Sequence, residues 1–288
     1  MIYPEYFHMD GLDDIKNIDF KGKKAYFVAG GTDMMCYLRD GFINPEKSCV
    51  VDIAAVKELY GISEDSDYLK IGAMATFSDI LESDLVKKWA PAVVSTAETF
   101  ATPQIRNRAT IGGNIGNASP AGDSLPPLAV HNAKVVAFGK NGIRTIDIMN
   151  VFAGPKKTNL ANGELITAVL IPKIAEEKNF KLKGIFLKIG GRKTHIISKA
   201  SVAIAGLFNG AQSINVNIAL GAVGPTVIKA DRAAGMLNGK KITPELIEKC
   251  CEEIKSAATP ISDFRSTALY RSKVIAPLFK EAIMQLIK

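Results

Sequence analysis

Short apolar runs bounded by glycine, asparagine or charged residues dominate the first 171 residues. Runs of this length are typical of buried strands. They predict strands at residues 25–28, 50–53, 69–71, 135–138, 144–146 and 165–171. Between these strands, the pattern favours helices at residues 34–38, 77–81 and 91–100.

The pattern changes after residue 171. Residues 172–179 are polar and charged, which predicts a linker. Strand candidates then follow in succession at residues 185–189, 201–208 and 215–220. Helix candidates come after them at residues 229–237, 244–258 and 267–286, and Pro277 is expected to kink the last one. A group of strands followed by helices is typical of an α+β unit.

A chain of 288 residues is long enough for two or three compact units. The change in pattern predicts two α/β units, at residues 1–53 and 54–174, and an α+β unit at residues 175–288. The expected fold class of the whole chain is therefore α+β.

Charge and hydropathy argue against a nucleic-acid-binding protein and against a membrane protein. The net charge is +7, yet no basic block of five or more residues occurs, so we expect an anionic small ligand rather than nucleic acid. No apolar run is long enough to cross a bilayer, and residues 1–5 lack the pattern of a signal peptide. These features favour the cytoplasm, without membrane attachment.

Cysteine and histidine spacing argues against a metal centre on this chain. Cys36, Cys49, Cys250 and Cys251 form no C-x-x-C pair, whereas iron–sulfur and zinc sites usually need several thiolates at short spacings. Cys250 and Cys251 are interpreted as helix packing residues. The histidines His8, His131 and His195 are scattered, and His195 is interpreted as a surface residue.

A first glycine-rich segment lies between a predicted strand and a predicted helix. It consists of Val28, Ala29, Gly30, Gly31, Thr32 and Asp33. Two glycines permit a tight turn in which successive N–H groups point into one concavity and bind phosphate oxygens. The segment matches neither a dinucleotide fingerprint nor a P-loop, and an ordinary strand-to-helix turn is the alternative.

The second glycine-rich segment spans residues 110–123. Four glycines, two asparagines, a threonine and a serine fall within these 14 residues. The composition predicts a functional loop rather than a packed helix or a regular strand. Two such turns suit a pyrophosphate, and Asp123 is a candidate acceptor for ribose hydroxyls.

Alternative chemistry at the second segment is weaker. Ser119, Asp123 and His131 make a hydrolase triad on paper, but no nucleophile elbow accompanies them. Arg106 and Arg108 flank the segment and either attract phosphate or are plain surface charges.

Taken together, the segments carry a family resemblance. Ala-Gly-Gly-Thr-Asp, then Thr-Ile-Gly-Gly-Asn and Asn-Ala-Ser-Pro-Ala-Gly-Asp, resemble the FAD-binding medium subunit of molybdenum hydroxylases. That family includes flavin subunits of xanthine, carbon monoxide and nicotinate dehydrogenases. The resemblance covers nearly the whole chain, including residues 163–172 and 265–271. It implies a vanillyl-alcohol-oxidase-type (PCMH-like) FAD-binding fold of two α/β subdomains, plus a C-terminal α+β domain of the CO-dehydrogenase flavoprotein type.

The resemblance also implies roles for individual residues. The first segment, Val28 to Asp33, would wrap the pyrophosphate through backbone amides. Phe100 and Ile166 match positions beside the isoalloxazine, and Lys188 matches a basic position near the flavin. The remaining implied contacts, to the pyrophosphate and adenosine, are Ala109, Thr110, Gly113, Asn114, Asn117 and Asp123.

Each residue outside the glycine segments has a plainer interpretation. Phe100 and Ile166 suit a hydrophobic core, and Lys188 suits a solvated strand position. Two departures from relatives matter: Tyr26 replaces a basic residue, which leaves an adenine contact open, and no cysteine-rich insertion for a [4Fe–4S] cluster occurs.

The resemblance implies an electron relay. A large molybdopterin-binding subunit would oxidise the substrate, a small subunit with [2Fe–2S] clusters would pass the electrons on, and FAD on this chain would deliver them to NAD(P)+ or another acceptor. We therefore predict an oxidoreductase subunit with no catalytic acid, base or nucleophile of its own. Two alternatives are a free-standing FAD-dependent reductase or oxidase and a non-catalytic nucleotide-binding module.

Overall fold

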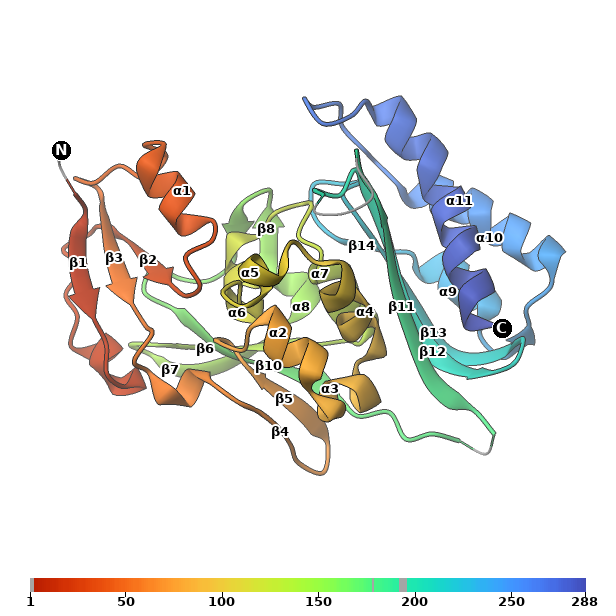
Figure 1. Cartoon of the computed structure of the whole chain (residues 1–288), viewed down its shortest axis with the longest axis horizontal. Coiled ribbons are helices and arrows are strands. Elements are labelled where there is room, and N and C mark those ends of the chain that lie inside the picture. Colours follow the sequence, from red (N-terminus) through yellow and green to blue (C-terminus); the bar gives the residue numbers. More distant parts are fainter. Residues whose placement is uncertain (1–2, 178, 192–195) are drawn as a thin grey trace.

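Three β-sheets follow one another along the chain and along the long axis of the molecule (Figure 1). The computed structural model describes residues 3–177, 179–191 and 196–288. His195 lies outside the described residues, so its interpretation as a surface residue stays a prediction. Within the described part, no helix is both long enough and apolar enough to cross a membrane.

The first sheet is parallel and has the order β1-β3-β2. Its strands are β1 (Glu5–His8), β2 (Lys24–Val28) and β3 (Ser48–Asp52). The associated helices are η1 (Leu12–Lys16), α1 (Met34–Arg39) and η2 (Lys57–Leu59). The hydrophobic core of this unit also contains Phe138 and Leu165 from the second sheet. The two N-terminal units therefore share packing and form one support for anything bound between them.

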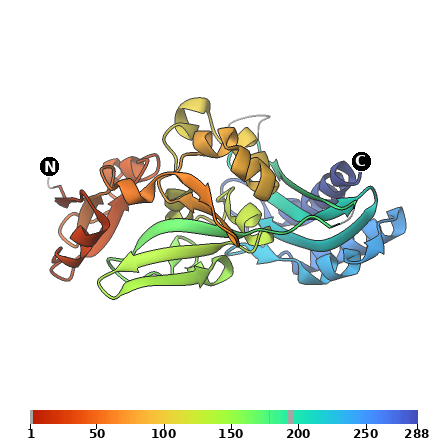
Figure 2. The same ribbon diagram turned by 90° about the horizontal axis from the view of Figure 1, so that it is seen from below.

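The second sheet is antiparallel and has the order β4-β5-β10-β6-β7. Its strands are β4 (Ile62–Glu64), β5 (Tyr68–Gly72), β6 (Lys134–Gly139), β7 (Gly142–Asp147) and β10 (Leu165–Pro172). The central strand β10 comes last in the sequence and pairs with β5 and β6, which come earlier. Figure 2 shows this sheet between the N-terminal and C-terminal units.

Short helices and one small hairpin fill the space beside the second sheet. The helices are α2 (Phe77–Glu82), α3 (Asp84–Trp89), α4 (Pro91–Thr99), α5 (Pro103–Arg106), α6 (Ile111–Asn117), α7 (Leu125–Val130) and α8 (Ile148–Val151). The hairpin consists of β8 (Phe152–Gly154) and β9 (Lys157–Thr158). Several of these helices begin at side-chain caps, such as Thr76 Oγ1, which accepts from the Asp79 amide at 3.1 Å.

The third sheet has the order β11-β12-β13-β14, with β15 also paired to β13. Its strands are β11 (Lys181–Ile189), β12 (Ala200–Asn209), β13 (Gln212–Gly221), β14 (Ile228–Lys229) and β15 (Lys240–Lys241). The helices are α9 (Asp231–Leu237), α10 (Pro244–Ala257) and α11 (Ala268–Leu286). The helix α11 continues through Pro277. The adjacent Cys250 and Cys251 are buried on α10, as expected of packing residues.

Strand β12 explains how the C-terminal unit attaches to the rest. Ala203 and Ala205 belong to the core shared with the helices of the second unit. Val202 and Ile204, on the opposite face, belong to the core under α9, α10 and α11. Because side chains alternate across a strand, one apolar run serves two cores, and the alanines on one face allow close approach.

Most predicted elements are confirmed within a few residues of their ends, and the structure is a mixed α/β fold. One prediction about local structure is wrong. Residues 111–117 form the helix α6, although the glycine content argued against a packed helix. Each glycine makes a helix less stable by about 1 kcal/mol. The burial of Ile111 and Ile115 and the cap by Thr110 outweigh this cost.

His131, at the end of α7, is buried, and its Nε2 accepts a hydrogen bond from the Ala92 amide at 3.3 Å. Burial lowers the pKa of His131 to about 4. In the unfolded chain the imidazole takes up a proton near pH 6.5, whereas in the folded chain it stays neutral down to about pH 4. This group's contribution to the free energy of unfolding is therefore fully present above pH 6.5 and falls as the pH drops towards 4. We expect this group alone to lower the free energy of unfolding by about 2 kcal/mol between pH 7 and pH 5.

Urea unfolding of the wild type and of His131→Gln at both pH values measures this effect. The glutamine oxygen keeps an acceptor for the Ala92 amide, and the variant should lose that part of the pH dependence. His8→Gln, which changes an exposed histidine, is the matched control. An unchanged pH dependence in His131→Gln would refute the assignment.

Candidate functional site

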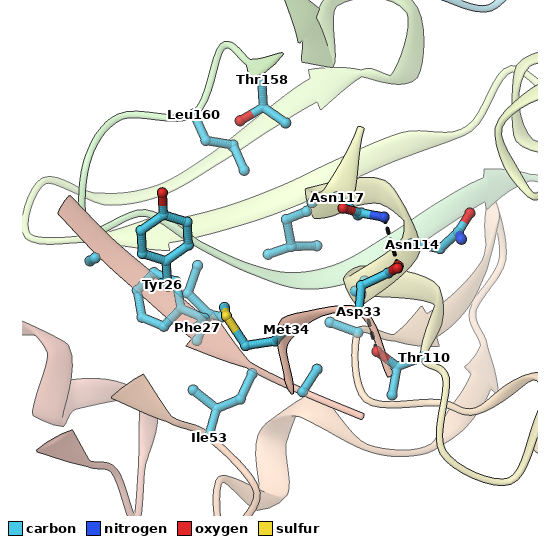
Figure 3. A pocket seen from close by; sticks show the side chains of 18 of the residues that line it. Tyr26, Phe27, Asp33, Met34, Ile53, Thr110, Asn114, Asn117, Thr158 and Leu160 are labelled. Atoms are coloured by element: carbon cyan, nitrogen blue, oxygen red, sulfur yellow. Dashed lines mark hydrogen bonds between the residues drawn. The ribbon is translucent and has the colours of Figure 1, made fainter. Parts of the chain in front are cut away.

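A cavity of about 1100 Å³ lies between the first sheet, helix α6 and the β8–β9 hairpin. Figure 3 shows Tyr26, Phe27, Met34 and Ile53 from the first unit on one side, and Thr158 and Leu160 on another. Most of the residues singled out in the sequence lie in its lining. These are Ala29, Gly30, Gly31, Thr32, Asp33, Phe100, Ala109, Thr110, Gly113, Asn114, Asn117 and Ile166.

The first glycine-rich segment leaves β2 and enters α1. Among the described residues, no backbone or side-chain acceptor takes a hydrogen bond from the amides of residues 30–34. These consecutive residues all line the cavity, and Gly31 has a φ of +75°, which few other residues adopt. A run of free amides at a cavity wall fits an anionic ligand with several oxygens.

Gly30 sets the distance between the two glycine-rich segments. A Cβ at this position would lie 1.7 Å from the carbonyl oxygen of Arg108, a backbone atom. Only glycine permits this approach, because a main-chain atom cannot rotate away as a side chain does. The turn after β2 is thereby held against the residues immediately before Thr110.

The second glycine-rich segment contributes side chains rather than amides. Thr110 Oγ1 accepts from the Gly113 amide at 3.1 Å, and the amides of Ile111, Gly112 and Asn114 donate to the carbonyls of Ala75, Ala73 and Thr110. A Cβ on Gly112 would lie 2.7 Å from the Ala73 Cβ. Gly112 therefore lets α6 pack closely against residue 73, and the polar groups left towards the cavity belong to the side chains of Asn114 and Asn117.

A hydrogen bond joins the two segments directly. Asn117 Nδ2 donates to Asp33 Oδ2 at 2.7 Å, which Figure 3 marks with a dashed line. Asn114 Oδ1 accepts from Ser124 Oγ at 2.7 Å. Asp33 and Asn117, which are 84 positions apart along the chain, are thus held in one polar wall of the cavity.

Phe100 and Ile166 form an apolar part of the lining. The Phe100 ring stacks on Phe77, with centroids 3.8 Å apart and planes 6° from parallel. Arg106 donates to the carbonyls of Phe100 and Ala101 at 2.9 and 3.4 Å, so its guanidinium holds this turn and is no free phosphate ligand. A flat apolar wall of this kind suits a planar ring system.

Three of the predicted site residues, Val28, Asp123 and Lys188, do not line the cavity. Lys188 Nζ lies 2.6 Å from Asp123 Oδ2, and Ser198 Oγ donates to Asp123 Oδ1 at 2.6 Å. The side chains of Lys188 and Asp123 are only 6% and 8% exposed. Asp123 therefore serves a buried ion pair between the second segment and β11, and the geometry gives no support to its role as a ribose acceptor.

The structure does not assemble the hydrolase triad. His131 is buried against the Ala92 amide, and Asp123 pairs with Lys188. Neither side chain interacts with Ser119, so the nucleophile, base and orienting acid that such a mechanism needs are not brought together.

Sequence reasoning missed the residues that close the cavity from the β8–β9 hairpin and from α1. Lys156 Nζ donates to Tyr37 Oη at 2.6 Å and to Asn117 Oδ1 at 2.9 Å. These residues come from three separate stretches of the chain. No local motif marks them, and only the fold brings them together.

Comparison with known proteins places this site in a family context. Residues 4–174 match the family described as the FAD binding domain in molybdopterin dehydrogenase. Residues 185–286 match the CO dehydrogenase flavoprotein C-terminal domain.

Individual relatives span nearly the whole chain. The glyceraldehyde dehydrogenase medium chain of Sulfolobus acidocaldarius is 29% identical, with 90% of this chain and 89% of that protein covered. The xanthine dehydrogenase FAD-binding subunit of Escherichia coli O157:H7 is 28% identical, with 98% and 96% covered. A structure of carbon monoxide dehydrogenase from Hydrogenophaga pseudoflava, lacking the Mo-pyranopterin moiety of its molybdenum cofactor, matches with a TM-score of 0.90 at 28% identity, with 98% and 96% covered.

The close approach at Gly30 predicts a severe effect of a single methyl group. In Gly30→Ala, the Cβ must displace the Arg108 backbone, which we expect to cost about 3 kcal/mol or more and to separate the two segments. Isothermal titration with ADP, a diphosphate probe, should show at least about tenfold weaker binding.

Gly235→Ala is the matched control, because its Cβ meets no atom within 4 Å on helix α9. This control should bind ADP as the wild type does and gain up to about 1 kcal/mol of stability. Wild-type stability and ADP affinity in Gly30→Ala would contradict the steric argument.

The buried pair predicts a second large effect. Lys188→Met leaves the Asp123 carboxylate buried without its cation, which should lower the free energy of unfolding by about 3–5 kcal/mol. The double variant Lys188→Met/Asp123→Asn removes both charges and should recover most of that loss. Urea unfolding measures both.

Lys181→Met provides the control on the same strand, because the Lys181–Glu176 pair is exposed and should contribute less than about 1 kcal/mol. An equal effect of Lys188→Met and Lys181→Met would argue against a structural role for the buried pair.

Proposed function

Because the chain belongs to the family of FAD-binding domains of molybdopterin dehydrogenases, we propose that it is the FAD-carrying electron-transfer subunit of a molybdenum-containing hydroxylase or dehydrogenase. In this proposal the chain holds FAD between [2Fe–2S] clusters on a small partner subunit and a final acceptor, which is NAD(P)+ or another acceptor. A large molybdopterin-binding subunit oxidises the substrate. The C-terminal match and the medium-chain relatives support this arrangement.

The observation that carries the proposal is the run of free amides at residues 30–34 in the cavity wall. FAD brings a pyrophosphate, whose oxygens need several donors, and a planar ring, which needs an apolar wall. The cavity offers the amides at one place and Phe100 and Ile166 at another, so the residues fit the cofactor. FAD, when bound, supplies one- and two-electron transfer chemistry.

The chain's own residues bind and orient. The amides of residues 30–33 face the pyrophosphate, with Val28 and Ala29 as the rigid strand end behind them. Thr110, Gly113, Asn114 and Asn117, with Ala109, form the second wall. Phe100 and Ile166 keep water from the ring side. Lys188 and Asp123 hold the second segment against β11.

A free-standing reductase or oxidase is the main alternative. It requires a substrate pocket with its own acid, base or nucleophile in this chain. Among the described residues, the cavity wall contains amides, asparagines, lysines, tyrosines and apolar side chains, and His131 lies outside the lining. The two carboxylates of the lining are engaged, because Asp33 accepts a hydrogen bond from Asn117 and Glu164 pairs with Arg144. This composition favours the holding of a cofactor over substrate chemistry.

Purification of the native assembly tests the proposal. We expect this chain to copurify with a large and a small subunit, and the assembly to carry FAD. If NAD(P)+ is the acceptor, NADH or NADPH should bleach the yellow flavin absorbance under anaerobic conditions, because electron transfer at that site runs in both directions. The isolated chain with bound FAD should turn over no organic substrate.

The outcomes separate the candidates. Substrate turnover by the isolated chain would replace the proposal with a free-standing flavoenzyme. A chain that takes up no FAD would refute the proposal altogether. If the substrate reduces the bound FAD but NAD(P)H does not, the relay stands and NAD(P)+ is excluded as its acceptor.

A further inference from the structure

The β8–β9 hairpin carries a lysine into the cavity wall beside Asn117. Lys156 lines the cavity, and its backbone amide donates to the Ala118 carbonyl at 2.8 Å, just after the end of α6. Lys156 has a φ of +59° and Ala118 a φ of +45°, so both residues adopt the left-handed conformation where they meet. The hairpin tip is therefore fixed to α6 through the main chain.

The ammonium of Lys156 has neutral partners only. It donates to Tyr37 Oη at 2.6 Å and to Asn117 Oδ1 at 2.9 Å, and no carboxylate of the described residues lies within 4.0 Å of it. Tyr37 Oη in turn donates to Asn117 Oδ1 at 3.1 Å. Two side chains from different elements thus hold the cation in place without neutralising it.

This cation lies next to the predicted anion site. Asn117, which accepts from Lys156, donates to Asp33 at the end of the first glycine-rich segment. The amides of residues 30–34 carry partial positive charge but no net charge. A diphosphate in that cavity carries two negative charges, and a nearby ammonium adds charge-assisted hydrogen bonds that amides alone do not supply.

We propose that Lys156 is a binding residue for the FAD diphosphate, with Tyr37 and Asn117 holding its ammonium in place beside the glycine-rich segments. This inference rests on the proposed function and adds a cation contributed by the hairpin. The hairpin then contacts the ligand through one charged side chain, whereas the glycine turn contacts it through backbone amides.

The test compares ligands with and without the diphosphate. The flavin-free full-length chain is titrated with FAD, ADP and riboflavin, in the wild type and in Lys156→Gln. We expect Lys156→Gln to weaken FAD and ADP by the same factor, about 10–100-fold, and to leave riboflavin unchanged. Lys156→Arg retains a cation and should recover most of the affinity for ADP.

Salt gives an independent readout. Wild-type ADP affinity should fall more steeply with ionic strength than that of Lys156→Gln, because the variant lacks one charge–charge attraction. Lys140→Gln, which removes an exposed lysine outside the cavity lining, is the matched control and should behave as the wild type. Lys156 is itself exposed, so its substitution should leave the fold intact.

The outcomes distinguish the two proposals. A wild-type chain that binds neither FAD nor ADP would overturn the proposed function. A wild-type chain that binds both, with equal affinity in Lys156→Gln, would overturn the inference alone. Equal weakening of FAD, ADP and riboflavin in Lys156→Gln would also overturn it, since that result describes a general packing role.

Discussion

The approach of Gly30 to the Arg108 carbonyl is the constraint on which the cavity depends. A Cβ would stand 1.7 Å from that oxygen, so the two backbones meet only because one residue has no side chain. The contact joins the end of a parallel sheet to the entry of the second glycine-rich segment, across 78 positions of sequence. Because both contact partners are main-chain atoms, the distance between the segments is rigid, and a binding site that spans them is preorganised.

The two glycine-rich segments divide their roles by the state of their amides. Residues 30–34 lead into the first turn of α1, where amides have no intrahelical acceptor, and they leave their amides free in the wall. Residues 111–117 form a helix whose first amides are already bonded to residues 73, 75 and 110, so their glycines serve close packing. Similar composition therefore produces a ligand surface in one case and a support for it in the other. Packing partners make the difference, because a buried amide takes an acceptor wherever the surrounding chain provides one.

The C-terminal unit stabilises the site from behind. Small residues on one face of β12 let its sheet approach the helices of the second unit, while larger residues on the other face build a separate core. The Lys188–Asp123 pair crosses this junction, with Ser198 Oγ bonded to the second carboxylate oxygen. A buried charge pair is costly to break, so it specifies how the second segment meets β11 more than it adds stability.

Local sequence determined the elements and the first half of the site. The run that ends at Val28, the two glycines after it and the strands of the C-terminal unit follow from hydrophobic pattern and backbone freedom, which act over a few residues. The paired motifs also identified the family. Tertiary structure decided the rest: that a glycine-rich stretch is the helix α6, that Asp123 faces Lys188, and that Lys156 reaches Asn117. Each of these depends on a partner 39 or 65 residues away, or on the packing of a helix against another unit, and no local pattern encodes such a partner. A glycine turn carries its function in its own backbone, whereas a side chain acquires its function from whatever the fold places beside it.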